Sequence, residues 1–238
     1  MYLDSQHPDP KVSVIVLNWN TPGHTVDCLE KVRACTELPH EVILVDNGST
    51  DGSVGKFCDL VLLWDTLIRL PKNVGFAAGV NRGLRAIHPK SEYVCLLNSD
   101  AFVTEGAIEE MVTVLEAHHQ LGLVGPRGKT VLNPPEQRGE PGVDYEDVIT
   151  DKTLAFFCVV IPSRVVDQIG LLDERFGLGT WEDGDYCKRL KDAGYTFGIA
   201  GKAFVFHEVN ATFRANNLDV QSICNENQGK YIEKWGSV

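Results

Sequence analysis

Two short apolar runs separated by one helix-length segment constrain the fold of this chain more than any other sequence feature. The runs are VSVIVLN, residues 12–18, and EVILVD, residues 41–46, and the segment between them extends from about Pro22 to Cys35. Strands that are buried on both faces read as continuous apolar runs rich in β-branched residues. The pattern therefore predicts a βαβ unit, in which two parallel strands are joined by a crossover helix.

Strands and helices continue to alternate along the rest of the chain. We expect further strands at residues 66–70, 93–98, 153–162, 195–199 and 203–207. We expect further helices at residues 75–87, 105–119, 163–170 and 182–194. The stretch from Pro126 to Asp151 concentrates Pro, Gly and charge, which predicts a long surface loop or a small hairpin. The predicted fold class is α/β, with a mostly parallel central sheet flanked by helices.

Charge and composition exclude several classes of partner. Lys plus Arg total 22 against 33 for Asp plus Glu, and the net charge of -11 argues against nucleic acid as a partner. The seven cysteines include no C-x-x-C pair, so a zinc module is not expected. The first ten residues do not resemble a signal peptide, and no apolar run reaches the length of a membrane span. We expect a cytoplasmic protein without a transmembrane segment, with peripheral membrane contact left open.

Polar side chains follow three of the predicted strands, at the point where each strand ends. These are residues 18–20 (NWN), 46–51 (DNGSTD) and 98–100 (NSD). Because ligands bind at the carboxyl ends of strands in open parallel sheets, three such endings predict a shared cleft. Asn98 and Asp100 are two residues apart, so an extended backbone would point both side chains to one side. A single ending of this kind would equally suit an ordinary turn.

Six sequence blocks resemble inverting family-2 glycosyltransferases with the GT-A fold, and most closely the rhamnosyltransferase-like branch. In order they are VSVIVLNWN, VILVDNGSTDGS, NVGFAAGVNRG, YVCLLNSDA, LLDERFGLGTWEDGDYCKRLKDAGY and AFVFHE. They extend from about Val12 to Glu208. The resemblance implies transfer of a single sugar from a UDP- or dTDP-linked donor, with inversion at the anomeric carbon. The implied acceptor is a hydroxyl of a glycan, a lipid-linked molecule or another compound.

The resemblance also implies a division of the chain into parts. Residues 1–11 form an amino-terminal extension, and residues 12–208 form the GT-A domain. Within that domain, residues 12–101 form the half that binds the nucleotide-sugar, and residues 102–208 form the acceptor and catalytic half. Residues 209–238 form a polar carboxyl-terminal tail, which could fold back as a helix or remain loose.

The resemblance places a nucleotide pocket at the first two strand ends. Asp46 stands where the family hydrogen-bonds the base, and a carboxylate suits the imide N–H of uracil or thymine. Trp19 stands where an aromatic ring lies against the base. Asn18, and Ser99 at the third strand end, are also expected to bind the sugar donor. A turn-opening role for Asp46 and core packing for Trp19 are the structural alternatives.

The start of the predicted helix at residue 75 is the next expected contact with the sugar donor. A helix start has exposed N–H groups, and Gly75 would let a ligand approach the backbone closely. Asn73 is expected to contact the donor at the same place. Gly79 and Gly83 could instead allow close packing of the helix.

The resemblance assigns a divalent cation to the third strand end. Asp100 supplies a carboxylate, the kind of ligand that Mn²⁺ and Mg²⁺ favour, and His207 completes the metal site. Asn98 departs from the family's Asp-x-Asp pattern by offering a neutral amide, so we expect it to contact the ribose or the donor sugar. An ordinary strand-end histidine is the alternative for His207.

The TWEDGDY segment supplies the expected catalytic base. The resemblance assigns Asp183 as the carboxylate that deprotonates the acceptor hydroxyl, and Glu182 as the residue that orients the acceptor or the loop. The alternative is electrostatic: Glu182, Asp183 and Asp185 all suit the positive start of a helix.

Two other functions compete with transfer. A sugar-phosphate nucleotidyltransferase would need a glycine-rich, Arg-containing phosphate loop after the first strand, and LNWNTPG stands there instead. A degenerate transferase that binds a nucleotide-sugar or a glycan without turnover stays open because of Asn98.

Overall fold

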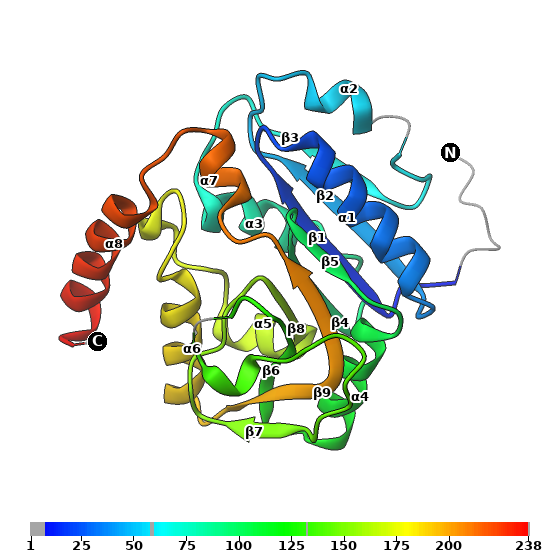
Figure 1. Cartoon of the computed structure of the whole chain (residues 1–238), viewed down its shortest axis with the longest axis vertical. Coiled ribbons are helices and arrows are strands. Elements are labelled where there is room, and N and C mark those ends of the chain that lie inside the picture. The colour runs from blue at the N-terminus through cyan, green and yellow to red at the C-terminus, as the bar shows by residue number, and fades with distance from the viewer. Residues whose placement is uncertain (1–7, 58–59, 132, 238) are drawn as a thin grey trace.

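A computed structural model describes residues 8–57, 60–131 and 133–237. Within these residues, nine strands form one sheet in the order β3-β2-β1-β4-β8-β6-β9-β5, and β7 pairs with β9 (Figure 1). The strands are β1 (Val12–Asn18), β2 (His40–Asp46), β3 (Thr66–Arg69), β4 (Tyr93–Asn98), β5 (Ala101–Val103), β6 (Leu121–Arg127), β7 (Val148–Thr150), β8 (Cys158–Pro162) and β9 (Thr196–His207). The helices are α1 (Pro22–Cys35), α2 (Ser53–Phe57), α3 (Phe76–Leu84), α4 (Ala107–Ala117), α5 (Ser163–Ile169), α6 (Glu182–Asp192), α7 (Ala211–Ala215) and α8 (Val220–Trp235), with 3₁₀ turns η1 (Pro135–Gln137) and η2 (Glu174–Phe176).

The predicted βαβ unit is confirmed and sets the register of the functional edge. Strand β1 pairs in parallel with β2 and with β4. Asn18 lies opposite Asp46 across one pair, and Leu17 lies opposite Asn98 across the other. The polar residues that end these three strands therefore lie at one edge of the sheet, as the shared-cleft prediction requires.

The sheet is parallel throughout its amino-terminal half, and in the second half only β6 and β9 among the described strands pair in parallel. Strand β8 runs antiparallel to both β4 and β6, and β5 and β7 run antiparallel to β9. The expectation of a mostly parallel sheet thus holds for β3-β2-β1-β4, and beyond β4 the sheet is mixed. The α/β class itself is confirmed.

Two predictions about the second half were wrong in detail. The two strands expected at residues 195–199 and 203–207 are one continuous strand, β9, whose register against β6 shifts between Gly125 and Arg127. The stretch from Pro126 to Asp151 is not all loop, since β6 extends to Arg127 and β7 lies within it. Pro126 sits at the register irregularity, where a strand tolerates the missing N–H.

Helices cover both faces of the sheet, which explains the continuous apolar strands. Val12, Val14 and Val16 pack in one core cluster with residues of α1 and α4. Ile15 belongs to a second cluster with residues of α3, α5 and α6. Alternate residues of β1 thus enter different cores, and each strand contributes apolar area to both.

The segment predicted as a carboxyl-terminal tail folds back as helices. Helix α8 lies beside α6 in Figure 1, and the fully buried Asp185 of α6 accepts hydrogen bonds from Lys234 Nζ at 2.5 Å and Trp235 Nε1 at 2.9 Å. The first of the two alternatives for this segment therefore holds. The domain boundaries themselves stay a prediction, and residues 1–7 of the expected extension lie outside the described residues. Among the described helices, none combines the length and apolar character needed to cross a membrane.

Candidate functional site

Asn18 and Asp46 form the centre of a buried polar network at the carboxyl edge of the sheet. Asn18 Nδ2 donates to Asp46 Oδ1 at 2.8 Å and to Ser49 Oγ at 2.9 Å. Asp46 Oδ2 accepts from the Ser49 N–H at 3.3 Å, which is the bond of a turn that the carboxylate opens. Asp46 is 2% exposed. The turn-opening role of Asp46 is therefore present, and base binding stays a prediction that this geometry permits, because among the described residues Asp46 Oδ2 accepts only this one long bond.

The network continues from Asn18 toward the third strand end. Asn18 Oδ1 accepts from Thr25 Oγ1 at 2.8 Å and from Thr21 Oγ1 at 3.4 Å. Thr21 Oγ1 lies 3.5 Å from the Oγ atom of Ser99, which is the residue between Asn98 and Asp100 in the sequence. One chain of hydrogen bonds thus connects the predicted nucleotide residue Asp46 to the predicted metal segment.

Asp100 and His207 meet because of strand pairing. Strand β5 begins at Ala101 and pairs antiparallel with the end of β9, so that Ala101 lies opposite His207. His207 Nε2 consequently lies 3.3 Å from Asp100 Oδ1, and the imidazole stacks on Phe157 with ring centroids 5.0 Å apart. Asp100 Oδ2 accepts from the Ala211 N–H at 3.2 Å.

This pair fits the protein's share of a Mn²⁺ or Mg²⁺ site. Within the described residues, no group of three His, Cys, Asp or Glu side chains could hold a metal ion. Asp100 and His207 would supply two ligands, and phosphate oxygens and water would complete the coordination. The half-buried Asn98 side chain makes no hydrogen bond to the described residues, and it stays a predicted sugar-donor contact.

The loop that carries Trp19 is tied to the start of the carboxyl-terminal helices. Asn216, which ends α7, donates to the Trp19 carbonyl at 3.3 Å and accepts from Asn20 Nδ2 at 2.7 Å. Asn20 has a φ of 55° and also holds the Thr50 N–H through Oδ1. Trp19 itself is half-buried, so its ring is neither fully in the core nor free.

At the start of α3, Asn73 and Gly75 contact other parts of the protein, whereas the sequence predicted contact with the sugar donor. Asn73 Oδ1 accepts from the Gly75 N–H at 2.7 Å and from Asn47 Nδ2 at 3.2 Å. The space where a Cβ of Gly75 would lie is taken by the Gly177 carbonyl oxygen, which also accepts from the Phe76 N–H. The close approach at Gly75 is therefore made by protein backbone. Contact of Asn73 and Gly75 with the sugar donor stays a prediction.

Gly79 and Gly83 support the packing alternative. A Cβ at Gly79 would lie 2.6 Å from Leu17 Cδ1, and one at Gly83 would lie 2.6 Å from Ile15 Cγ2. These glycines bring α3 close to β1.

Glu182 and Asp183 begin α6 with two differently placed carboxylates. Glu182 is 8% exposed, and its Oε2 atom is buried without a hydrogen-bond partner. Burial, together with the charge of Asp183, raises the pKa of Glu182 to about 8. Burial also raises the pKa of Asp183, against the opposing effect of the Gly184 N–H, which donates to Asp183 Oδ1 at 2.7 Å. Both carboxyl groups are therefore harder to ionise than in water, and burial is the main cause for each.

Glu182, Asp183 and Asp185 all lie in the first turn of α6, as the electrostatic alternative requires. Trp181 occupies the N-cap position and has no side-chain cap, whereas Asp185 is fully buried and paired with Arg189 and Lys234. No hydrogen bond or ion pair among the described residues joins Asp183 to Asp46, Asp100 or His207. The catalytic and metal predictions thus come from separate parts of the fold.

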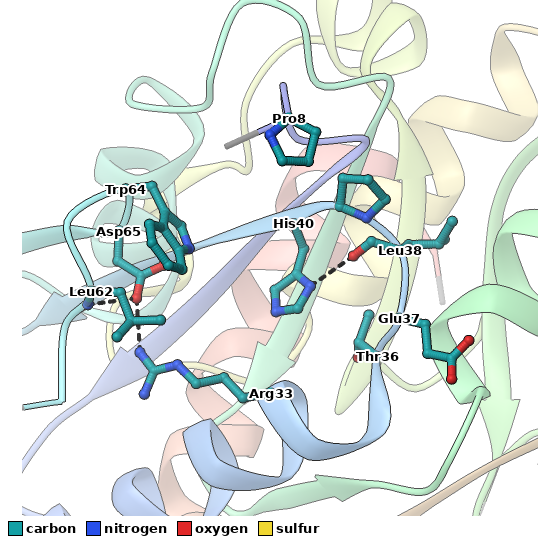
Figure 2. Close-up of a pocket in the computed structure, with 10 residues that line it drawn as sticks. Pro8, Arg33, Thr36, Glu37, Leu38, His40, Leu62, Trp64 and Asp65 are labelled. Atoms are coloured by element: carbon teal, nitrogen blue, oxygen red, sulfur yellow. Dashed lines mark hydrogen bonds and ion pairs between the residues drawn. The ribbon is translucent and has the colours of Figure 1, made fainter. Parts of the chain in front are cut away.

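Of two pockets in the described structure, one adjoins the predicted site and the other lies away from it. A pocket of about 320 Å³ adjoins His207 and is lined by Phe102, Lys129, Thr130, Phe206, His207 and Glu208. Another pocket has a volume of about 350 Å³. Figure 2 shows its lining, in which Arg33 forms an ion pair with Asp65 and the His40 ring forms a hydrogen bond with the Leu38 carbonyl. This second pocket lies at the start of β2, the opposite edge of the sheet from Asp46, and contains none of the predicted site residues.

Several polar residues of the network escaped the sequence reasoning. They are Thr21, Thr25 and Asn216, whereas Asn20, Asn47 and Ser49 lie in the predicted polar strand ends but were given no individual role there. Those in the loops after β1 and β2 belong to segments rich in Asn, Ser and Thr, and that composition was a usable signal. Asn216 had no signal, because its partners Trp19 and Asn20 lie almost 200 residues away in sequence.

With this geometry in place, comparison with known proteins decides the family. A model of glycosyl transferase family 2 matches residues 13–157, more than half of the chain. The chain belongs to glycosyl transferase family 2. This match covers the three polar strand ends and stops before α6, so it contains Asp46 and Asp100 but not Asp183. The predicted family is confirmed.

Curated relatives carry the same class of name. The glycosyltransferase GlyG of Streptococcus pneumoniae is 38% identical over 103 residues, which are 42% of this chain and 33% of GlyG. The N-acetylglucosaminyl-diphospho-decaprenol L-rhamnosyltransferase of Mycobacterium tuberculosis is 24% identical over 233 residues, 82% of this chain and 75% of that enzyme. The chain thus spans about one third of GlyG and three quarters of the rhamnosyltransferase.

Solved structures confirm the GT-A fold. GalNAc-T7, in a crystal structure with UDP, GalNAc and Mn²⁺, matches with a TM-score of 0.69 at 14% identity over 86% of this chain and 44% of its own. The mannosyltransferase PcManGT of Pyrobaculum calidifontis, in complex with GDP-Man and Mn²⁺, matches with a TM-score of 0.65 at 19% identity over 85% of this chain and 58% of its own.

Proposed function

We propose that this chain transfers a single sugar from a UDP- or dTDP-linked donor to an acceptor hydroxyl, with inversion at the anomeric carbon. The observation that carries the proposal is the meeting of Asp100 and His207 at the sheet edge to which the Asp46 network leads. This arrangement supports the proposal, because a nucleotide-sugar requires a nucleotide pocket next to a pair of side chains that can hold a diphosphate-bound cation.

Asp46 accounts for the nucleotide preference. Its Oδ2 atom accepts only the 3.3 Å bond from Ser49 in the described structure, so it retains capacity to accept the imide N–H of uracil or thymine. Adenine presents no such imide. Trp19, on the adjoining loop, would cover the base, and the three other polar residues predicted at the edge would hold the ribose and the sugar: Asn18, Asn98 and Ser99.

Asp100 and His207 would hold the divalent cation. When bound, the cation neutralises the negative charge that develops on the leaving diphosphate. The two side chains already lie together, so little reorganisation is needed, although Asp100 must release the His207 contact or share it. Mn²⁺ in the structures of GalNAc-T7 and PcManGT supports this assignment.

Asp183 would remove the proton from the attacking hydroxyl. An acceptor hydroxyl is a weak nucleophile near neutral pH, and a positioned carboxylate of raised pKa is a stronger base than an ordinary aspartate. Glu182, buried beside it with a pKa raised by burial and by the Asp183 charge, would orient the acceptor or the loop. Attack from the side opposite the diphosphate inverts the anomeric carbon.

A panel of nucleotides tests the proposal directly. We expect UDP or dTDP to raise the melting temperature more than ADP, and Mn²⁺ to increase that shift, because a ligand that binds the native state stabilises it. Sugar donors linked to the preferred nucleotide are then assayed for transfer and for hydrolysis, and release of the free nucleotide measures both. Equal shifts from all nucleotides, with GDP included, would contradict the base-pocket assignment. Binding without transfer or hydrolysis would favour the degenerate binding module.

A further inference from the structure

Helix α8 inserts one buried amide into the loop that precedes Glu182 and Asp183. Asn227 is 1% exposed, and its Nδ2 donates to the carbonyls of Phe176 at 2.7 Å and Gly179 at 2.6 Å. The Thr180 carbonyl lies 3.3 Å from the same nitrogen. A single side chain therefore donates both of its N–H groups to carbonyls of one loop, and the Phe176 carbonyl also accepts from the Gly179 N–H at 3.3 Å.

The loop needs such support because its backbone is unusual. Thr180 and Trp181 have φ angles of 74° and 72°, a region that L-residues other than glycine rarely adopt. The φ angles of Gly177 and Gly179 are also positive, at 56° and 129°. Backbone of this kind persists where surrounding contacts determine it, and such strain gathers at active sites. The turn leads directly into Glu182.

Further contacts attach α8 to both sides of the carboxylate pair. Trp181 Nε1 donates to Cys224 Sγ at 3.3 Å, and the Trp181 ring lies 5.1 Å from that of Tyr231. On the other side, Lys234 Nζ bridges Asp185 Oδ1 at 2.5 Å and Asp173 Oδ2 at 2.8 Å. Glu182 and Asp183 thus lie between two points at which the chain is attached to α8.

The opposite side of the loop touches the sugar-donor half. The Gly177 carbonyl accepts from the Phe76 N–H at 2.7 Å. A Cβ at Gly179 would lie 3.5 Å from Phe76 Cβ and 3.6 Å from Phe213 of α7. The loop is held between α3 and α8, so its conformation depends on residues far away in the sequence.

We propose that Asn227 is a positioning residue for Asp183, acting through the carbonyls of residues 176–180. This inference rests on the proposed function, since it takes Asp183 to be the base. Asn227 touches no reacting atom. Its loss would let the loop relax from its left-handed turn and displace the carboxylate from the acceptor, and a misplacement of about 1 Å can cost roughly 10²-fold in rate.

The test compares the same chemical change on two faces of α8. Asn227→Asp replaces the donating amide with a carboxylate that faces the same carbonyls, while Asn225→Asp makes that change on the exposed face. Val32→Ala, in the core beneath α1, serves as a control for lost stability alone. Asn227→Ala removes the amide without adding charge, for use if the aspartate variant does not fold.

Two readouts are measured on each full-length variant, well below its melting temperature. Hydrogen exchange of the amides of Gly177, Gly179 and Asp185 reports the loop directly and needs no ligand. Release of UDP from a UDP-sugar that the wild type turns over, with water as acceptor where none is known, reports catalysis. We expect faster exchange and a roughly 10- to 10²-fold lower kcat in the Asn227 variants, with unchanged UDP affinity.

The outcomes separate this inference from the proposed function. Unchanged exchange in both Asn227 variants would overturn it, as would a kcat loss no larger than that of Val32→Ala at equal stability. A wild type that turns over no donor would overturn the catalytic proposal, whereas faster exchange in the variants would still uphold Asn227 as the support of this loop.

Discussion

The sugar-donor edge and the Glu182–Asp183 turn hold their polar groups in opposite ways. At the donor edge Asn18, Asp46 and Ser49 bond to one another, and the strand register alone brings them together. At the turn, Glu182 has an orphaned carboxylate oxygen and a pKa raised by burial. There the backbone is held by contacts from α8.

The difference follows from what each region does in the proposed reaction. A nucleotide pocket gains from a rigid network that is complete before binding, because little ordering remains to be done. A base gains from a raised pKa, which burial gives Asp183 although the hydrogen bond from the Gly184 N–H opposes it. The first region is built by local βαβ geometry, and the second requires tertiary contacts. The predictions below test this contrast, from the largest expected effect to the smallest.

Asp183→Asn should have the largest effect. The amide cannot accept the hydroxyl proton, so we expect transfer to fall by roughly 10²- to 10⁴-fold. The amide oxygen of the variant can still accept the Gly184 N–H, and folding and UDP affinity should therefore change little. Single-turnover transfer with saturating donor measures the loss, and Asp192→Asn on the exposed end of α6 is the control. Near-wild-type transfer would remove Asp183 from catalysis.

Loss of the divalent cation should come next. We expect EDTA to suppress transfer and Mn²⁺ or Mg²⁺ to restore it, because the leaving diphosphate loses a stabilisation worth several kcal/mol, or about 10²-fold or more in rate. Asp100→Asn should be the more damaging change, and Asn98→Ala the milder one. Steady-state assays across a Mn²⁺ titration measure both. Full activity in EDTA would mean that protein side chains stabilise the diphosphate.

Glu182→Gln should change how stability depends on pH. An unfolded glutamate loses its proton near pH 4.5, whereas the folded state keeps it to about pH 8. The protonated Glu182 side chain therefore contributes in full to the stability of the wild type below pH 4.5, and this stability is lost as the pH rises toward 8. Between pH 6 and pH 8 the free energy of unfolding of the wild type should fall by about 2 kcal/mol because of Glu182. The glutamine variant should not show this fall.

Urea unfolding at pH 6 and pH 8 measures this difference for the wild type, Glu182→Gln and Glu30→Gln. Glu30 is exposed on α1 and serves as the control. An identical pH dependence in the wild type and Glu182→Gln would show that Glu182 is ionised throughout, and the contrast between the two regions would weaken.

Asp46→Asn should have the smallest effect, confined to nucleotide choice. One hydrogen bond to the imide is worth about 1.4 kcal/mol, so the preference for UDP over ADP should fall by about tenfold. Calorimetric titration of both nucleotides measures it, with Asp27→Asn on the exposed face of α1 as the control. A preference that survives unchanged would give Asp46 only its turn-forming role.

Local pattern was enough to predict the first half of the fold. The apolar runs of β1, β2 and β4 and the helix between the first two follow from burial on both faces and from segment length. The second half was harder, because β9 is one strand with an irregular register against β6, and its Gly201 and Lys202 resemble a turn in the sequence. The long stretch after Pro126 concealed β7 for a similar reason: three residues are too few to show a period.

The sequence by itself determined the class of residue at each strand end and the family to which the chain belongs. Only the tertiary structure decided which acids at the start of α6 are paired. Three acidic residues within four positions carry the same signal for a helix start, yet Asp185 is bound by Lys234, Trp235 and Arg189, while Glu182 is buried with an unpartnered oxygen. The physical reason is that pairing and burial depend on α8, whose contacts lie some fifty residues away in the chain and leave no local pattern.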